Sequence, residues 1–400
     1  MSRSRARRAA PLIATPALAA ALVAAAAAAV PAGAAVEAPA GEPGYSTVAT
    51  VAPVAAQRSA QGRIIDDLSV HDGLIHLGYG DYGDNTGPID LVTLDPATGE
   101  VAVALAGVPT EEIQVVRDVG GSRFAPMADP RASWRTPSGF ATDASGRWEN
   151  AAAVPVVHAY DVTTMDGSDL WVAGSAYLDG TDRVGAVAYR SVDGGTTWEQ
   201  AVTDLPATAS GYERYYWVAE LGGKIYVQAR HYGTTSSSGP VRVFDGRRWT
   251  TGSTRLGNVC LPSDASDIEV FADTLVCGRG TVVTTFDGRT LHQSPAPTRQ
   301  TTTGGSIGAI DVFSDDQHVW VLGGGGIARS ADGVTWQQVT TSVPEDARSI
   351  AVADGHIYLG TTTSTVLRSD LTVAELAPAP AAAEPVVSGK GKGGGKGPGK

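Results

Sequence analysis

Arg190–Gln200 reads RSVDGGTTWEQ, and Arg329–Gln338 reads RSADGVTWQQ, about 140 residues further along the chain. Both stretches hold Ser, Asp, Gly and Trp in the same order. Asp and Ser side chains form hydrogen bonds with backbone amides in tight turns, and glycine adopts positive φ at little cost. Tryptophan covers such a turn as a large apolar side chain. Each stretch is therefore predicted to be a turn between two strands, and its return indicates an internal repeat.

A longer pattern surrounds these turns and recurs along the chain. It comprises a short apolar strand, a tight turn, a second strand that often ends in Gly, a variable loop, a third strand, and a turn with Asp-Gly or a close variant. Alternation of the kind in LWVAG (Leu170–Gly174) is typical of strands, and Gly and Asp clusters bound the runs. Seven copies lie between Ile64 and about Leu376. Their second strands are expected to begin near Leu74, Phe124, Leu170, Ile225, Leu275, Val319 and Ile357.

This spacing is close to the roughly 40–50 residues of one four-stranded propeller blade. No long segment between these copies has helical periodicity. We therefore predict an all-β fold, a seven-bladed β-propeller with four-stranded antiparallel blades, over residues 64–376. A β-sandwich of tandem hairpins is the alternative, but a sandwich gives no reason for a repeat of this period. Within the preceding segment, residues 35–63, Tyr45–Pro53 is a candidate extra strand that pairs with the last blade and closes the ring.

The opening turns carry a resemblance to a known group of proteins. Ser191–Trp198 matches the pattern S-x-D-x-G-x-T-W, and Ser330–Trp336 is a copy one residue shorter. TDASGRW (Thr142–Trp148) and FDGRRW (Phe244–Trp249) look like degenerate versions. The chain thus resembles the Asp-box, or BNR-repeat, β-propellers, which include sialidases, other glycosidases and sortilin-like receptors. The resemblance implies the fold but no single activity, and it implies a structural role for Ser191, Asp193, Gly195, Trp198, Ser330, Asp332, Gly333 and Trp336.

The first 34 residues have the pattern of a secretory signal peptide. Four arginines stand among the first eight residues, Leu18–Val30 is an Ala-rich apolar run, and Ala32–Ala34 fits a cleavage site. A transmembrane anchor is the alternative, but the run is shorter than the roughly 20 residues that a span needs. We therefore expect a secreted protein, extracellular or associated with the cell envelope, with no transmembrane span.

The charge of the chain is unevenly distributed. Of its 30 basic residues, four are the N-terminal arginines and four are lysines among the last eleven residues, which leaves 22 basic against 42 acidic residues. A body this acidic repels phosphate backbones, so no nucleic-acid partner is expected. Residues 377–400 are rich in Pro and Ala and then in Gly and Lys, and we expect a disordered tail. This basic tail is a candidate tether to anionic polymers of the cell envelope.

The two cysteines of the chain are Cys260 and Cys277. In an oxidising compartment, a pair this close in sequence predicts one disulfide. Two buried free thiols are the alternative.

A propeller blade has two ends with different connections. The first-to-second and third-to-fourth turns share one face, here called the turn face. The second-to-third loops and the connections between blades share the other, the loop face. The second-to-third loops are long in the first four copies and short in the last three. Functional residues concentrate on loops of this kind. The candidate ligand-binding residues from the long loops are Asp81, Tyr82, Asp84, Asn85, Trp134, Arg135, His231 and Tyr232. The connections between blades add His158, Arg214 and Tyr216.

Aromatic rings, carboxylates and arginines together suit a carbohydrate or protein ligand, because they supply stacking surfaces and oriented polar groups. Several of these residues have a structural alternative. Asp81 and Asp84 could hold a structural calcium through their oxygens, or simply form turns; no other cofactor is expected. His158 could satisfy a hydrogen bond in the core, and Trp134 and Arg135 could pack on a neighbouring blade.

We therefore expect a binding module that recognises a glycan, a peptide or a cell-envelope partner. The alternative is a sialidase-like or other exo-acting glycoside hydrolase. For that reaction the resemblance implies a Tyr nucleophile assisted by a carboxylate, an acid/base residue and an arginine triad. Tyr216 or Tyr212 is the candidate nucleophile, Glu213 is the candidate carboxylate that assists it, and Asp81 or Asp84 is the candidate acid/base residue. The candidates for the triad are Arg123, Arg135 and Arg214. The chain has no nucleophile-elbow or zincin motif.

Overall fold

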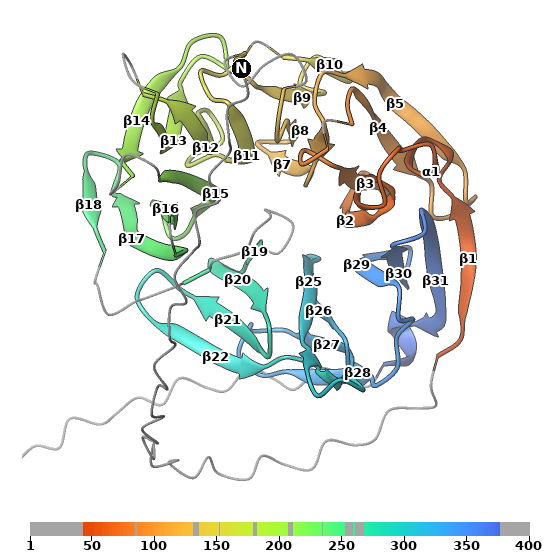
Figure 1. Cartoon of the computed structure of the whole chain (residues 1–400). Coiled ribbons are helices and arrows are strands. Elements are labelled where there is room, and N and C mark those ends of the chain that lie inside the picture. Colours follow the sequence, from red (N-terminus) through yellow and green to blue (C-terminus); the bar gives the residue numbers. More distant parts are fainter. Residues whose placement is uncertain are drawn as a thin grey trace, which may run out of the picture. The chain divides into compact units, whose positions relative to one another are not determined.

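The computed structural model describes residues 43–84, 86–130, 136–151, 153–178, 182–206, 211–233, 235–252, 259–260 and 268–376. Seven antiparallel sheets stand around a central channel, so the predicted seven-bladed β-propeller is confirmed (Figure 1). In each blade the first strand lies nearest the channel. The second strands begin within two residues of every predicted start.

Each blade holds four strands in chain order from the channel outward, except that the seventh takes its outermost strand from the N-terminal end. The first three blades comprise β2 (Ile65–His71), β3 (Leu74–Gly80), β4 (Ile89–Leu94) and β5 (Val101–Val108); β7 (Arg117–Val119), β8 (Ser122–Pro126), β9 (Phe140–Thr142) and β10 (Glu149–Asn150); and β11 (His158–Thr163), β12 (Leu170–Tyr177), β13 (Val184–Ser191) and β14 (Glu199–Asp204). The next three comprise β15 (Tyr212–Glu220), β16 (Ile225–Tyr232), β17 (Ser237–Phe244) and β18 (Trp249–Thr251); β19 (Ile268–Phe271), β20 (Thr274–Arg279), β21 (Val282–Phe286) and β22 (Leu291–Pro295); and β25 (Ala309–Ser314), β26 (Val319–Gly323), β27 (Gly326–Ser330) and β28 (Gln337–Thr340). The seventh comprises β29 (Ala347–Ala353), β30 (His356–Thr361), β31 (Thr365–Thr372) and β1 (Tyr45–Thr50).

Short elements join the blades. β6 (Glu112–Ile113) pairs with β3, and β23 (Arg299–Gln300) pairs with β24 (Ser306–Ile307) between the fifth and sixth blades. None of the described helices is long and apolar enough to cross a membrane.

The ring closes through its two ends. β1 pairs antiparallel with β31, from Tyr45 opposite Ser369 to Thr50 opposite Thr365. The Val51 amide then donates to the Ser364 carbonyl at 2.8 Å. An early segment and the last strands thus share one sheet, which covers the edge that β31 would otherwise expose.

The first strands are tied to their neighbours by acidic side chains at β-bulges. Asp161 follows the bulge in β11, and its Oδ2 accepts a hydrogen bond of 3.1 Å from the Val218 amide in the fourth blade. Asp311 occupies the same place in β25 and accepts one of 2.7 Å from Ile350 in the seventh blade. Each carboxylate therefore satisfies a backbone donor that a neighbouring blade leaves unpaired.

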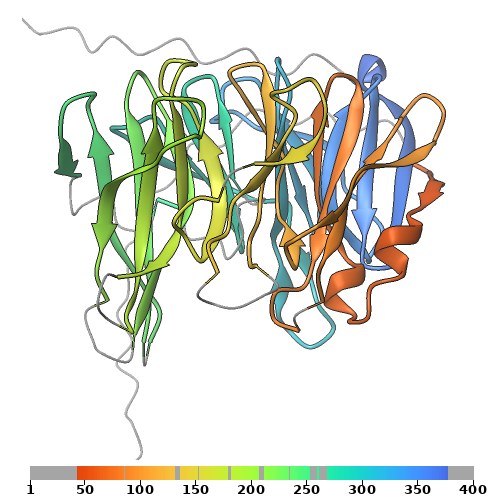
Figure 2. The same ribbon diagram turned by 90° about the horizontal axis from the view of Figure 1, so that it is seen from above.

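The two turns with the Ser-Asp-Gly-Trp pattern lie between third and fourth strands, on the turn face seen edge-on in Figure 2. In the first turn the Ser191 hydroxyl donates to Asp193 at 2.8 Å and accepts from the Gly195 amide at 2.8 Å. Gly195 has φ of 88°, a conformation that glycine adopts at little cost. Trp198 reaches the preceding blade, where its ring lies edge-on to Phe140 at 5.9 Å. This turn therefore packs two blades together as well as closing a hairpin.

The second turn repeats this arrangement. Ser330 donates to Asp332 at 2.9 Å, and Asp332 accepts from the Thr335 amide at 2.6 Å. The Gly333 carbonyl accepts a hydrogen bond of 2.6 Å from Thr285 on the preceding blade. Both turns thus contact the third strand of the blade before their own.

Cys260 and Cys277 form a disulfide, with their Cα atoms 6.0 Å apart, so this prediction is confirmed. Cys260 lies in the connection before the fifth blade, and Cys277 lies in β20. The Trp217 indole donates to the Cys260 carbonyl at 3.3 Å. The bridge therefore fixes the connection against the blade that follows it.

Candidate functional site

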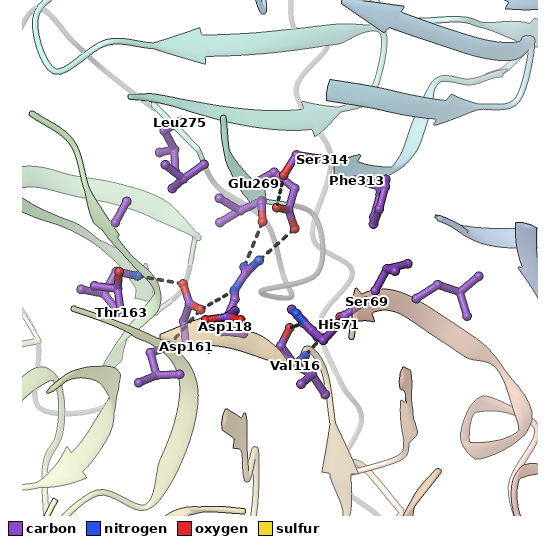
Figure 3. A pocket seen from close by; sticks show the side chains of 18 residues that line it. Ser69, His71, Val116, Asp118, Asp161, Thr163, Glu269, Leu275, Phe313 and Ser314 are labelled. Carbon is purple, nitrogen blue, oxygen red and sulfur yellow. Dashed lines mark hydrogen bonds and ion pairs between the residues drawn. The ribbon is translucent and has the colours of Figure 1, made fainter. Parts of the chain in front are cut away.

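The central channel holds a cavity of about 300 Å³ towards the turn face (Figure 3). Most of its lining comes from the first strands of six blades, and Leu275 comes from the second strand β20. The first-strand residues include His71 of β2, Thr163 of β11, Val270 of β19 and Ser314 of β25. The cavity is therefore formed by several blades together and by no single blade.

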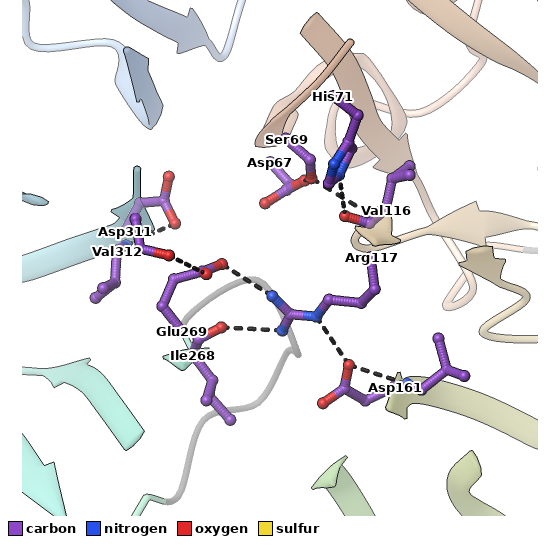
Figure 4. Close-up of polar contacts among 12 residues, drawn as sticks. Asp67, Ser69, His71, Val116, Arg117, Asp161, Ile268, Glu269, Asp311 and Val312 are labelled. Carbon is purple, nitrogen blue, oxygen red and sulfur yellow. Dashed lines mark hydrogen bonds and ion pairs between the residues drawn. The ribbon is translucent and has the colours of Figure 1, made fainter. Parts of the chain in front are cut away.

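Arg117 crosses this channel and joins three blades (Figure 4). Its Nε donates to Asp161 at 2.9 Å, and its NH1 donates to Glu269 at 2.8 Å. Its NH2 donates to the Ile268 carbonyl at 2.9 Å, and Ser314 donates to the second oxygen of Glu269 at 2.8 Å. The second, third, fifth and sixth blades therefore meet in one hydrogen-bonded network.

Burial and charge act in opposite directions on this network. Burial alone lowers the pKa of the Arg117 guanidinium, but Asp161 and Glu269 outweigh it and hold that pKa above its usual value. Burial raises the pKa of Asp161 and of Glu269, although Arg117 opposes both shifts. Burial also raises the pKa of the nearby Asp67 to about 7, against a hydrogen bond from Ser69. The carboxylates therefore depend on Arg117 to stay ionised.

The network is internally satisfied. Both oxygens of Asp161 and both oxygens of Glu269 accept hydrogen bonds, and all three guanidinium nitrogens of Arg117 donate. Buried polar groups that satisfy one another are typical of structural cross-links. We assign this cluster to holding the ring together. None of its residues was predicted from the sequence as part of a site.

A second cluster lies on the loop face, over the third and fourth blades. Tyr212, Arg214 and Tyr216 alternate along β15, so they share one face of the strand. Tyr212 stacks on Tyr232 of β16 with ring centroids 4.6 Å apart and 13° between planes. The hydroxyls of Tyr216 and Tyr232 lie 2.6 Å apart, and Arg214 donates to the Tyr216 hydroxyl at 3.2 Å.

The neighbouring blades contribute to the same cluster. Tyr160 packs against Tyr216 with ring centroids 4.6 Å apart, and it stacks on His158 at 5.6 Å. The Nδ1 of His158 donates to the Ala128 carbonyl at 2.8 Å and lies 3.6 Å from Asp129. Burial, with Arg214 nearby, lowers the pKa of His158 to about 3, so this ring is neutral near pH 7. The core hydrogen bond expected of His158 as a structural alternative is therefore present.

Two buried polar atoms of this loop-face cluster have no hydrogen-bond partner among the described residues. One is the Tyr160 hydroxyl, in a residue that is 1% exposed. The other is the Nε of Arg214. Buried polar groups are nearly always hydrogen-bonded. The loop-face cluster therefore differs from the Arg117 network, in which the buried polar groups satisfy one another.

The loop-face cluster thus brings together several of the predicted site residues. Arg214, Tyr216 and Tyr232 are in direct contact, and His158 is joined to them through Tyr160. Tyr82 is close enough to Tyr160 for an electrostatic interaction. Tyr160 and Asp129 were missed, although Tyr160 stands two residues after His158 in β11 and Asp129 stands in the second-to-third loop of the second blade. The only sequence signal for Tyr160 is its proximity to His158, and the only one for Asp129 is its place in a long second-to-third loop.

Other candidates lie elsewhere. Glu213 points to the opposite side of β15, where its carboxylate lies 3.1 Å from Nδ1 of His231. It therefore does not assist Tyr216, which bonds to Arg214 and Tyr232. Burial raises the pKa of Glu213, opposed by a hydrogen bond from His231.

The convergence of arginines that the sialidase-like alternative requires is not found between Arg123 and Arg214, the described members of the candidate triad. Arg123 follows the Gly120–Gly121 turn and pairs with Asp72 and Asp143 on the turn face. Arg214 lies on the loop face, at the other end of the channel. The two cannot hold one substrate carboxylate, because first and second strands run in opposite directions and place them at opposite ends.

Asp81 forms a turn. Its Oδ1 accepts from the Gly83 amide at 2.9 Å and from the Asp84 amide at 3.1 Å, and Ser59 donates to its Oδ2 at 2.6 Å. Within the described ranges, no three His, Cys, Asp or Glu side chains gather as a metal site. Asn85, Trp134 and Arg135 lie outside the described residues, as do the N-terminal 42 residues and the tail from residue 377.

Comparison with known proteins gives the fold alone. No family model and no curated protein sequence matches the chain. Among solved structures, the chain is similar to virginiamycin B lyase from Staphylococcus aureus, at 11% identity and a TM-score of 0.46 over 78% of this chain and 96% of that one. It is similar to the GH74 xyloglucanase from Xanthomonas campestris, at 14% identity and a TM-score of 0.50 over 84% of this chain and 54% of the enzyme. It is also similar to BamB from Moraxella catarrhalis, at 14% identity and a TM-score of 0.38 over 76% and 84% of the two chains.

The xyloglucanase alone among these three reaches a TM-score of 0.50, and the present chain spans about half of its length. At such low identity the similarity supports the propeller fold but no particular activity, because propellers have many unrelated functions.

Proposed function

We propose that this protein is an exported binding module that takes a carbohydrate or protein ligand on the loop face of its second to fourth blades. The proposal rests chiefly on one observation: within a cluster of tyrosines, the buried Arg214 Nε and Tyr160 hydroxyl have no hydrogen-bond partner in the part of the chain that the structure describes. Unsatisfied buried donors are costly unless a ligand or water completes them. Propeller scaffolds with Asp-box turns and a disulfide suit such a role outside the cytoplasm.

The chemistry of the cluster fits recognition better than bond cleavage. Tyr216 has a tyrosine and an arginine as its hydrogen-bond partners, and the neighbouring Glu213 bonds to His231 instead. A tyrosine nucleophile needs a carboxylate to accept its proton. Aromatic faces with a few oriented polar groups suffice for binding.

Glycan and peptide arrays test this proposal. We expect the protein to bind a subset of glycans, and we expect Tyr212→Ala and Tyr232→Ala to remove that binding by taking away the stacked pair. Val192→Ala, an exposed apolar residue on the turn face, is the matched control and should bind as the wild type does. Fluorogenic glycosides report any hydrolysis. Binding that survives in both tyrosine variants would place the site elsewhere, and product release abolished by Tyr216→Phe would identify a hydrolase.

A further inference from the structure

A groove on the turn face opens beside the mouth of the central channel. It has a volume of about 670 Å³ and shares Phe313 and Ser314 with the channel cavity (Figure 3). Its apolar lining comes from the first, fifth, sixth and seventh blades and comprises Val70, Val270, Phe271, Phe313 and Val352. Val270 is 44% exposed. We call this surface the turn-face groove, and an apolar surface left open to solvent indicates a binding partner.

Carboxylates stand along the rim of this groove. Asp315 and Asp316 line it directly, and Asp273 and Asp354 lie in the first-to-second turns of the fifth and seventh blades. Some of these aspartates also shape their turns. Asp315 accepts from the Gln317 amide at 2.7 Å, and Asp273 and Asp354 have φ of 57° and 47°, which Asp tolerates better than most residues. Asp316 is exposed beside the apolar lining, so the groove combines an apolar floor with a negative rim.

The last described residues lie next to the same groove. The Val373 amide donates to the Gly355 carbonyl at 2.8 Å. Gly355 belongs to the first-to-second turn of the seventh blade, three residues after the groove-lining Val352. Leu376 and Val352 also pack against one buried core cluster. The chain that follows Leu376 therefore starts on the turn face, close to the groove.

The sequence beyond Leu376 has the chemistry that this groove would accept. It contains an apolar stretch, Pro385, Val386 and Val387, and then four lysines with no acidic residue among them, at positions 390, 392, 396 and 400. Lys390 is 14 residues beyond Leu376, and a flexible chain of that length spans about 20 Å on average. Exposed ion pairs are individually weak, but a tether of this length keeps the segment near the groove at an effective concentration of about millimolar.

We infer that residues 385–400 bind in the turn-face groove of their own chain, with the two valines against its apolar lining and the lysines beside its rim carboxylates. The segment then covers the mouth of the channel at the end opposite the loop-face cluster. The inference is independent of the proposed function, because the two binding surfaces lie on different faces. Burial of the valines stabilises the contact, and the ion pairs make it sensitive to salt.

Carbodiimide cross-linking of the full-length protein tests this inference, because the reagent joins a lysine directly to a carboxylate that it touches. Natural and isotopically heavy protein are mixed in equal amounts, so mass spectrometry separates links within one copy from links between copies. We expect Lys390 and Lys392 to link to Asp316 within one copy, and we expect the yield to fall as salt rises. Glu345, whose side chain is 86% exposed in a connection of the loop face, is the control carboxylate and should not link.

Variants of the segment itself separate docking from random encounters. Val386→Ser/Val387→Ser keeps every lysine and should lower the yield of Asp316 links by about threefold or more, because it removes the apolar contact. Ala381→Ser/Ala382→Ser, in the stretch before the valines, is the matched control and should link as the wild type does. Equal linking to Asp316 and Glu345, or a yield that the valine substitutions leave unchanged, would overturn the inference. Links found only between copies would also overturn it, in favour of a contact with a second molecule.

Discussion

The guanidinium of Arg117 in the second blade lies 2.8 Å from the carboxylate of Glu269 in the fifth blade, so a single ion pair spans the central channel. Blades that are distant in sequence are thus joined at the axis of the ring, in addition to the closure of the ring by β1. The same guanidinium reaches Asp161, which in turn holds the Val218 amide of the fourth blade.

Removing Arg117 should destabilise the protein strongly. Arg117→Met leaves two buried carboxylates without their cation, which typically costs about 3–5 kcal/mol in the free energy of unfolding. Urea denaturation measures the loss. Arg147→Met is the control, because the Arg147 side chain is 83% exposed and lies 3.9 Å from Glu149. It should change the stability by less than about 1 kcal/mol, and equal effects of the two substitutions would contradict the assignment.

Asp67 should make stability fall as the pH rises through its own titration. Its folded-state pKa of about 7 lies above the roughly 3.9 of an unfolded chain, so the folded protein binds this proton more tightly. The free energy of unfolding should therefore decrease between about pH 4 and pH 7, by at most about 1.4 kcal/mol per pH unit. In Asp67→Asn this contribution is absent. Urea denaturation at several pH values measures this. If the free energy of unfolding changes with pH in the same way in the wild type and in Asp67→Asn, the prediction is refuted.

The disulfide should contribute measurable stability. Cys260 and Cys277 are separated by 17 residues, and closing a loop of this length is worth about 3 kcal/mol in the chain-entropy model. The double variant Cys260→Ala/Cys277→Ala should lose about that much, and the wild type under reducing conditions should behave in the same way. A reduced wild type as stable as the oxidised protein would show that the connection is held by its packing alone.

Strand β1 should be needed for a closed, monodisperse ring. Deleting residues 1–51 removes five register pairs with β31 and should cost at least about 3 kcal/mol. It also exposes the β31 edge, so we expect self-association in light scattering. Deleting residues 1–42 keeps β1 and is the matched control. A truncated protein that remains monomeric and equally stable would mean that closure depends on side-chain packing between blades.

The fold could be read from the sequence because its signals are local. Gly195 and Trp198 mark turns whose geometry depends on neighbouring residues, and the strand starts repeat with them. The links between blades could be predicted only in part. Asp161 and Asp311 stand at equivalent places in their repeats, so a shared role was visible in principle.

The candidate site was harder to predict, because it depends on which residues converge in three dimensions. Arg117 reaches a residue 152 positions away, and nothing local marks that pairing. On the loop face, the connections between blades pointed to His158, Arg214 and Tyr216, which do come together around Tyr160. Strand alternation places Glu213 on the opposite side from Arg214 and Tyr216, but its pairing with His231 of the next strand depends on the register between the two strands.

Hydrogen–deuterium exchange with a bound oligosaccharide tests most directly whether the ligand binds on the loop face. Residues 158–160, 212–216 and 230–232 should gain protection on binding, because they carry the loop-face cluster. Residues 68–71, 117–118 and 268–270, which line the channel near the turn face, should exchange as in the free protein. Protection confined to the channel-lining residues, or bound ligand without protection at the loop-face cluster, would contradict the proposed site.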